Sequence, residues 1–295
     1  MKAISSLKGL RQALRPIRNT GNIALVPTMG AFHEGHLSLM RKAKQECVFT
    51  VVSLFVNPLQ FGPKEDYDVY PRNLASDRKM ARSVGIDLLW TPSEKNLFPP
   101  AFQTRIQVPQ LSHCLEGAAR PDHFTGVATI VGILLNLVRP DRLYLGEKDF
   151  QQTRVIARLA ADLHFDTQIR ICPTVREKDG LAMSSRNARL TASERKAAPI
   201  LYRALRQGQA LVRGGTLDAQ AVIQAVQSIL VSEPGIKIEY IALCDPLRLE
   251  PIRRIKTSAV LLAAIRVGSV RLIDNVALKV TSIRTSGRAD SLTMK

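Results

Sequence analysis

The residues best suited to chemistry lie in one stretch near the amino terminus, Pro27-Thr28-Met29-Gly30-Ala31-Phe32-His33-Glu34-Gly35-His36. It joins a predicted buried strand to a predicted helix. Gly30 and Gly35 allow the backbone to approach a ligand closely, and free N–H groups at the start of a helix favour phosphate. His33 and His36 are three positions apart, so both imidazoles would face the same side of one helical turn. The pattern favours a nucleotide-binding loop, and two capping or surface histidines are the alternative.

A second stretch combines glycine, a cation, carboxylates and amides at the expected carboxyl end of a later strand: Gly146-Glu147-Lys148-Asp149-Phe150-Gln151-Gln152. Lys148 is suited to pairing with phosphate, Asp149 to capping a helix or holding Mg²⁺, and Gln152 to binding a substrate. An ordinary capped helix would account for the same residues.

A third stretch, residues 176–187, contains Met183-Ser184-Ser185-Arg186 and follows a strand predicted to end at Cys172. A mobile loop with two hydroxyl groups and an arginine suits the clamping of a polyphosphate during reaction. A charged linker between domains is the alternative. Three phosphate-suited loops at one edge of one sheet together favour an ATP-consuming, adenylating enzyme.

A fourth stretch, Val56-Asn57-Pro58-Leu59-Gln60-Phe61-Gly62, has a different character. Asn57 and Gln60 put amides in an apolar, proline-bounded turn, which suits recognition of the hydroxyl and carboxylate groups of a small substrate. The same amides would also serve to cap the turn. Their spacing does not distinguish the two roles.

The elements that must position these loops alternate between strand and helix over the first two thirds of the chain. Apolar and β-branched runs predict strands at 22–27, 48–56, 86–90, 105–108, 142–145 and 168–172. Helical patterns lie between them, at 35–44, 73–83, 126–138 and 150–163. This alternation predicts the α/β class, with a Rossmann-like, doubly wound parallel sheet. Ligands of such sheets bind beyond the carboxyl ends of the strands.

The last third of the chain follows a different pattern. Predicted helices at 192–212 and 217–231 precede predicted strands at 237–243, 259–267 and 270–273. Helices followed by clustered strands predict a smaller C-terminal α+β domain with an antiparallel sheet. We therefore expect a first domain at 1–175, a connecting loop at 176–187, a second domain at 188–281 and a disordered tail at 282–295.

Composition bounds the class of protein. The 295 residues are 45% hydrophobic and 23% charged, as in an ordinary soluble protein. No apolar run approaches the roughly 20 residues that cross a bilayer, and no signal peptide is evident, so we expect a cytoplasmic protein without a membrane partner. The net charge of +17 is spread along the chain and aromatic residues are only 5%, which favours anionic substrates over nucleic acid. A nucleic-acid-binding protein is the alternative that rests on charge alone.

The four stretches together resemble the pantothenate synthetase (pantoate–β-alanine ligase) family, which belongs to the nucleotidyltransferases with HIGH-type and KMSKS-like loops. Residues 27–36 are similar to the family's PTMGALHEGH, with Phe32 in place of the usual leucine. The other matches are 56–61 with VNPxQF, 122–127 with HFxGV, 146–152 with GEKDFQQ and 179–187 with DGLAMSSRN. The similarity covers nearly the whole chain.

The resemblance implies ATP-dependent condensation of (R)-pantoate with β-alanine through pantoyl adenylate, with Mg²⁺ and a homodimer. It implies that the first domain binds ATP and pantoate, that 176–187 is a mobile KMSKS-like loop and that the second domain is a lid. The residues it assigns to ATP are Met29, Gly30, Ala31, Phe32, His33, Glu34, Gly35, His36, Gly146, Glu147, Lys148, Asp149, Val175, Met183, Ser184, Ser185 and Arg186.

Roles within the site follow from the same resemblance. His36 matches a residue assigned as proton donor, and His33, His36, Lys148 and Arg186 are expected to offset negative charge in the transition state. Gln60 matches a residue that binds both pantoate and β-alanine. The pantoate contact corresponds to Gln152, and Asn57 lines the same pocket.

Two points stay open in the sequence. Asp77 and Asp149 are candidate Mg²⁺ ligands, but this ion often rests mainly on phosphates and water. An adenylyltransferase that joins AMP to a phosphate-bearing acceptor is the alternative activity. It would require additional arginines where this chain offers the neutral amides of Asn57, Gln60 and Gln152.

Overall fold

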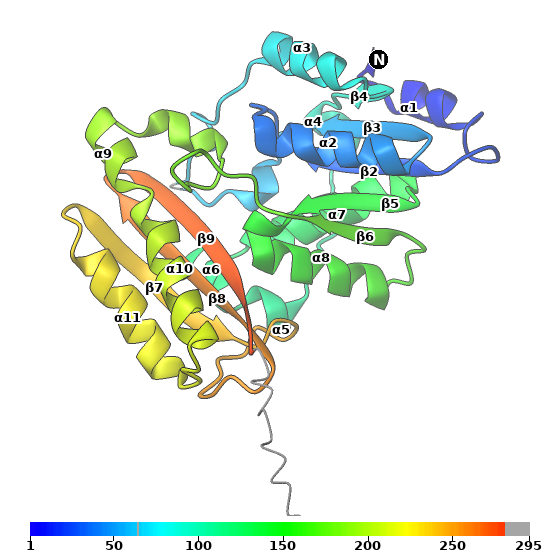
Figure 1. Cartoon of the computed structure of the whole chain (residues 1–295). Coiled ribbons are helices and arrows are strands. Elements are labelled where there is room, and N and C mark those ends of the chain that lie inside the picture. Colours follow the sequence, from blue (N-terminus) through cyan, green and yellow to red (C-terminus); the bar gives the residue numbers. More distant parts are fainter. Residues whose placement is uncertain (64, 281–295) are drawn as a thin grey trace, which may run out of the picture.

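The computed structural model describes residues 1–63 and 65–280, and the predicted tail at 282–295 lies outside the described residues. Within them the chain forms a parallel sheet of six strands and an antiparallel sheet of three (Figure 1). The predicted fold class, a Rossmann-like sheet followed by a smaller α+β unit, is confirmed. Among the described residues, no helix combines the length and apolar character that crossing a membrane requires.

Every strand pair in the six-stranded sheet is parallel, in the order β1-β4-β3-β2-β5-β6. The strands are β1 (Lys2–Ile4), β2 (Ile23–Thr28), β3 (Phe49–Leu54), β4 (Leu88–Trp90), β5 (Arg142–Gly146) and β6 (Gln168–Cys172). The strand order changes direction between β2 and β5. The loops after these two strands therefore lie side by side at the switch point, where such sheets bind ligands.

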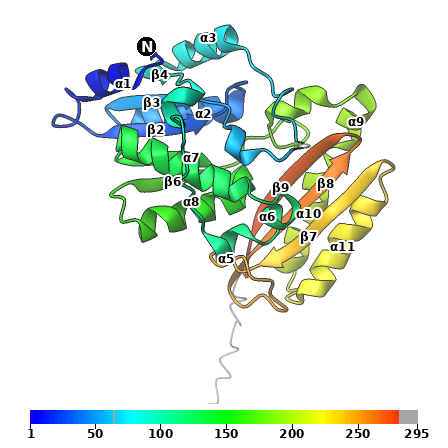
Figure 2. The same cartoon turned by 180° about the vertical axis from the view of Figure 1, so that it is seen from behind.

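Helices cover both faces of this sheet (Figures 1 and 2). They are α1 (Leu7–Leu14), α2 (Glu34–Glu46), α3 (Leu74–Val84), α7 (His123–Val138) and α8 (Phe150–Asp162). Alternate residues of β2 divide between two cores. Ala24 and Val26 pack with residues of α2 and α3, whereas Ile23 and Leu25 pack with residues of α1, α7 and α8. A strand buried on both faces explains the nearly continuous apolar runs of the sequence.

The second sheet has helices on one face and the first unit on the other. Its strands are β7 (Ile236–Cys244), β8 (Ser258–Val267) and β9 (Val270–Lys279), and its helices are α9 (Ala192–Ala197), α10 (Ile200–Arg213) and α11 (Ala219–Val231). Leu261 and Ala263 of β8 pack with residues of α10 and α11. Val260 and Leu262, on the opposite face, join the core of the first sheet. The two units are therefore packed together through β8.

Some elements differ from the prediction. Neither β1 nor α1 was predicted; β1 has only three residues, and none of them is fully buried. The strand predicted at 105–108 is wrong: this segment lies outside the sheet, and the Ile106 N–H donates to Thr129 Oγ1 of α7 at 3.0 Å. Pro199 divides the helix predicted at 192–212 into α9 and α10. No helix was predicted between residues 91 and 121, where the structure has three short ones, α4 (Glu94–Leu97), α5 (Pro109–Ser112) and α6 (Glu116–Ala119).

Candidate active site

A cavity of about 1200 Å³ lies at the carboxyl ends of β2 and β5 and extends to the second sheet. It is lined by most of the residues that the sequence predicts for ligand binding: Met29, His33, Gly35, His36, Asn57, Gln60, Gly146, Lys148, Asp149, Gln152, Val175, Met183, Ser184, Ser185 and Arg186. The four stretches with chemical character therefore meet in one cavity, as their positions at one sheet edge predict.

Five of the predicted ATP contacts do not line this cavity: Gly30, Ala31, Phe32, Glu34 and Glu147. The Phe32 ring is buried in the core beneath α2, so its substitution for leucine changes packing. The Glu34 carboxylate forms an ion pair with Arg41 on the surface. The structure does not bring these two side chains to the site.

The two histidines begin helix α2. His33 caps the helix, because its Nδ1 accepts the Gly35 N–H at 3.1 Å, and its own N–H points to Nδ1 of His36 at 3.4 Å. The ring centroids are 4.1 Å apart. Since both Nδ1 atoms face backbone N–H groups, each neutral imidazole carries its proton on Nε2. The two Nε2–H groups are the donors that this pair can offer to a ligand.

Burial determines the charge of these rings. Burial, followed by the positive charge of Lys148, lowers the pKa of His33 to about 4. Burial and then the neighbouring His33 lower the pKa of His36 to about 3. Both imidazoles are therefore neutral at neutral pH. They can offset charge on a ligand as hydrogen-bond donors, and not as the cations that histidine becomes in acid.

The loop that leads into α2 is held by a buried carboxylate. Gly30 and Ala31 have φ angles of +88° and +51°, a left-handed conformation that is unfavourable for alanine. Asp77 of α3 accepts the Ala31 N–H at 3.0 Å and the Phe32 N–H at 2.7 Å, and it is only 2% exposed. Both oxygens of Asp77 are engaged with the loop. Asp77 therefore positions the loop, and it is not among the residues that line the cavity.

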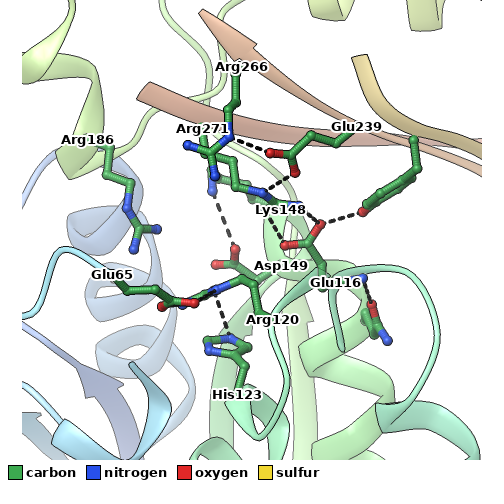
Figure 3. Close-up of polar contacts among 12 residues, drawn as sticks. Glu65, Glu116, Arg120, His123, Lys148, Asp149, Arg186, Glu239, Arg266 and Arg271 are labelled. Atoms are coloured by element: carbon green, nitrogen blue, oxygen red, sulfur yellow. Dashed lines mark hydrogen bonds and ion pairs between the residues drawn. The ribbon is translucent and has the colours of Figure 1, made fainter. Parts of the chain in front are cut away.

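The turn after β5, η2 (Glu147–Asp149), brings a lysine and a carboxylate into the cavity. Lys148 Nζ lies 3.4 Å from Asp149 Oδ1 (Figure 3). Burial works to raise the pKa of Asp149, but the neighbouring Lys148 ammonium and the Arg186 guanidinium act against it, and the pKa is lowered. Asn275 of β9 holds the turn by donating to the carbonyl oxygens of Glu147 and Lys148 at 3.0 and 3.1 Å. The second sheet thus fixes the backbone that carries Lys148.

The loop at 176–187 reaches the histidine loop. Ser185 Oγ donates to the carbonyl oxygen of Ala31 at 3.1 Å. Arg186 binds both carboxylate oxygens of Asp66, through Nε at 2.8 Å and Nη2 at 3.0 Å. Arg189 donates to the same carboxylate at 2.9 Å. Asp66, which the sequence did not single out, therefore determines where the charge of Arg186 lies.

The amide of Asn57 is fully used inside the protein. Its Oδ1 accepts the Leu59 N–H at 3.2 Å and so caps the short helix η1 (Pro58–Gln60). Its Nδ2 donates to Gln60 Oε1 at 3.0 Å and to the Gly126 carbonyl oxygen at 3.1 Å. Asn57 lines the cavity, but its polar atoms orient Gln60 and close the turn.

The side-chain nitrogen of Gln60 can donate a hydrogen bond to a ligand in the cavity. Gln60 Nε2 lies 3.2 Å from Met29 Sδ. A thioether sulfur is a weak acceptor, so an oxygen of a ligand would form a stronger hydrogen bond in its place. Gln152 also lines the cavity. Apolar side chains complete this part of the wall: Phe55, Val127, Ile130, Val131 and Leu134. An amide pair against an apolar wall suits a small, branched acid.

Charged residues from both units form another part of the wall (Figure 3). Arg271 of β9 pairs with Glu116 of α6 and, at 2.6 Å, with Glu239 of β7. Arg266 of β8 donates to Glu239 at 2.7 Å, and the Tyr240 hydroxyl donates to Glu116 at 2.6 Å. Burial works to raise the pKa of Glu116, but its pair with Arg271 lowers it. No sequence pattern indicates this network, because its members come from four separate elements.

These features suit a nucleotide bound beside a small acid, and comparison with known proteins identifies the family. The sequence model described as pantoate–β-alanine ligase matches residues 2–277. The chain belongs to this pantoate–β-alanine ligase family. A curated relative, the pantothenate synthetase of Moorella thermoacetica, is 44% identical over 281 residues, which are 95% of this chain and 99% of the relative.

Solved structures of the pantoate–β-alanine ligase family share the fold. The pantothenate synthetase from Thermus thermophilus has a TM-score of 0.90 at 43% identity and covers 94% of this chain and 99% of its own. The Francisella tularensis pantoate–β-alanine ligase, complexed with beta-gamma ATP and β-alanine, has a TM-score of 0.78 at 36% identity. The match covers 94% of this chain and 97% of the Francisella chain. The family predicted from the motifs, and the ligase class of enzyme, are confirmed. Membership of this family favours the ligase over the adenylyltransferase and the nucleic-acid-binding protein that were considered from the sequence.

Proposed function

We propose that the chain catalyses its family's reaction, the ATP-dependent condensation of pantoate with β-alanine to pantothenate, AMP and diphosphate through pantoyl adenylate. One observation carries the proposal. The histidine loop, Lys148 and Arg186 share a single cavity with the amides of Gln60 and Gln152. The first group suits a triphosphate, and the second suits a hydroxy acid.

In the first half-reaction, a carboxylate oxygen of pantoate attacks the α-phosphorus of ATP. An O–P bond forms, the bond to diphosphate breaks, and negative charge grows on the nonbridging and leaving oxygens. We assign the Nε2–H groups of His33 and His36 to these oxygens, together with the charges of Lys148 and Arg186. Asp66 occupies the Nε–H and one N–H of Nη2 of Arg186, so the N–H groups of Nη1 and the second N–H of Nη2 are the donors that we assign to phosphate.

The residues present are compatible with Mg²⁺ carried by the nucleotide. No group of three or more His, Cys, Asp or Glu suited to a metal occurs within 1–63 and 65–280. The Asp149 carboxylate, which lines the cavity beside Lys148, is the residue we assign to a bound Mg²⁺–ATP, directly or through water. When bound, Mg²⁺ supplies positive charge to the phosphate oxygens.

In the second half-reaction, the amine nitrogen of β-alanine attacks the carbonyl carbon of pantoyl adenylate. A C–N bond forms, the C–O bond to AMP breaks, and the ammonium proton passes to water. We assign Gln60 to both small substrates and Gln152 to pantoate, as the motifs predict. Holding the two reactants in contact supplies much of the acceleration.

We also propose the division of labour predicted from the sequence, with an ATP- and pantoate-binding part at 1–175, a mobile loop at 176–187 and a lid at 188–281. Two contacts support it, from Ser185 to Ala31 and from Asn275 to the Lys148 turn. Both join a later part of the chain to a loop of the first part, and we expect them to separate when the lid opens. Protection of the loop from limited proteolysis on ATP binding would test this division.

A homodimer and a cytoplasmic location belong to the same proposal. β6 is the outer strand of its sheet, and Ile171 on it is 37% exposed. An outer strand with an exposed apolar residue is a surface that a second copy of the chain would cover. Light scattering of the purified protein would give twice the 32.6 kDa of one chain; a monomer at all concentrations would contradict the proposal.

ATP–diphosphate exchange tests the activity. With purified protein and Mg²⁺, we expect exchange only when pantoate is present, and pantothenate once β-alanine is added. Exchange supported only by a phosphate-bearing acceptor would instead establish the adenylyltransferase. The pairing of two cavity arginines argues against that outcome, because Arg120 and Arg271 are already engaged with Glu65 and Glu116.

A further inference from the structure

The turn that carries Gln60 contacts a neighbouring segment to which the reaction proposed above assigns no role, although Arg120 and His123 of this segment also line the cavity. Residues 120–126 include the first turn of α7 and contact the main chain of η1. Three of them, Arg120, His123 and Gly126, contact the backbone at Leu59 and Gln60. None of these three contacts was predicted from the sequence.

His123 and Arg120 hold the carbonyl oxygen of Gln60. His123 Nδ1 lies 2.8 Å from this oxygen, and Arg120 Nη2 lies 3.4 Å from it. Arg120 Nη1 lies 3.2 Å from His123 Nε2. Because a guanidinium only donates hydrogen bonds, Nε2 must accept and the ring proton lies on Nδ1, where it is donated to Gln60. Glu65 fixes Arg120 in turn, accepting from its Nε at 2.8 Å.

The charge state of His123 supports the same arrangement. Burial, and then the positive charge of Arg120, lowers the pKa of His123 to about 4. The ring is therefore neutral at neutral pH and keeps a lone pair for Arg120. A protonated ring would lose that acceptor.

Gly126 lets α7 approach the turn without any side chain between them. A Cβ atom at Gly126 would lie 2.2 Å from the Leu59 carbonyl oxygen and 2.6 Å from the Gln60 nitrogen. Both are backbone atoms, so the turn itself would have to move by about 1 Å to reach ordinary van der Waals contact. The Gly126 carbonyl also accepts from Asn57 at 3.1 Å, which ties the same glycine to the Gln60 amide.

We propose that His123 and Gly126 are positioning residues for pantoate recognition, which set the position of the Gln60 amide by holding its main chain from two sides. This inference rests on the proposed function, because it takes Gln60 to be the substrate contact. It predicts that damage to the 120–126 segment appears in the use of pantoate and leaves the use of ATP unchanged.

Gly126→Ala and Gly132→Ala form a matched pair in helix α7. At Gly132 a Cβ would meet only the end of the flexible Ile106 side chain, at 2.6 Å, and Gly132 does not line the cavity. A displacement of about 1 Å in a site can cost about 100-fold in rate. We therefore expect Gly126→Ala to lower kcat/KM for pantoate by about 100-fold at saturating ATP, with KM for ATP within about twofold of the parent. Gly132→Ala should leave both constants within about twofold.

A second pair avoids the risk that Gly126→Ala does not fold. In His123→Asn the amide nitrogen stands where Nδ1 was and can still donate to Gln60, whereas His123→Leu has no donor. Loss of this hydrogen bond predicts about a tenfold fall in kcat/KM for pantoate in His123→Leu, and His123→Asn should recover most of it. Equal melting temperatures of the two variants would show that the difference is not one of folding.

The outcomes separate this inference from the proposed function. If Gln60→Ala impairs pantoate use but Gly126→Ala matches Gly132→Ala, or His123→Asn matches His123→Leu, the positioning role is wrong. A loss shared equally by pantoate and ATP would also overturn it, because it would indicate general damage. If Gln60→Ala leaves pantoate use intact, Gln60 is not the pantoate contact. The positioning role of His123 and Gly126 is then wrong as well.

Discussion

Replacing His33 by asparagine separates two roles that one imidazole fills. His33 Nδ1 accepts the Gly35 N–H and so caps α2, and we assign its Nε2–H to the oxygens of ATP. An asparagine Oδ1 stands near the position of Nδ1 and is among the best N-caps. Nothing in asparagine reaches the position of Nε2. His33→Asn therefore keeps the cap and removes the donor, whereas His33→Ala removes both.

The two effects have different magnitudes. Loss of one donor that acts in the transition state costs about 2.7–4 kcal/mol, or about 10²–10³ in rate, and both variants should show it. Loss of an N-cap costs about 0.5–2 kcal/mol of stability, and only His33→Ala should show that. We expect the alanine variant to melt a few degrees lower, at about 2–4 °C per kcal/mol for a domain of this size.

Pantoate-dependent ATP–diphosphate exchange measures the first effect and urea denaturation the second. We predict that the exchange rate of His33→Asn is about 10²–10³-fold lower than that of the parent. A rate within about threefold of the parent would refute the role of Nε2–H as a donor in the transition state. If His33→Asn loses as much stability as His33→Ala, the capping role of His33 is refuted. His36→Asn is the comparison, and because His36 matches the family's proton donor we expect its exchange to fall further.

Three other predictions concern the loop, its protonation and the metal. Asp77→Asn leaves one loop N–H without an acceptor, and since a hydrogen bond to a charged group contributes about 1.5–3 kcal/mol, KM for ATP should rise at least about tenfold; an unchanged KM in steady-state assays would count against the assignment. His33, His36 and His123 have folded-state pKa values of about 4, 3 and 4, below the ordinary 6.5. The unfolded chain therefore binds more protons in acid, and the free energy of unfolding should fall as pH drops from about 6.5 toward 4. Urea midpoints would measure this, and a midpoint independent of pH in that window would contradict it. Calorimetric titration with Mg²⁺ should give heat only when ATP is present, and binding of Mg²⁺ to the protein alone would indicate a site built from side chains.

The parts of the site that the sequence predicts are those encoded in continuous stretches. A glycine-containing run after a β-branched strand gives the position of the histidine loop, because the strand, the turn and the helix start are adjacent in the chain. Parallel pairing then brings the loops after β2 and β5 together. The ring of His33, the N-cap of α2, lies beside that of His36 in the first turn, as the three-residue spacing predicts.

The parts that sequence reasoning missed are contacts between distant residues. Asp66 and Arg186 are separated by 120 positions, Asp77 and Phe32 by 45. One aspartate on a helix has no periodicity or motif that identifies its partner, and many of the chain's carboxylates could have been chosen. The charge of the histidines was missed for the same reason, since it depends on burial that only the assembled fold determines.

Each ligand-binding loop is oriented by a side chain from elsewhere in the fold. Asp77 holds the histidine loop, Asn275 holds the Lys148 turn and Asp66 holds Arg186. In the first two cases the supporting group binds main-chain atoms, which leaves the side chains of the loop for the ligand. Asn275 belongs to the second sheet, so the backbone beneath Lys148 is fixed only when the two units are together. We therefore expect the proposed nucleotide site to depend on both units, because their separation would loosen Lys148 even though every residue of the GEKD turn lies in the first.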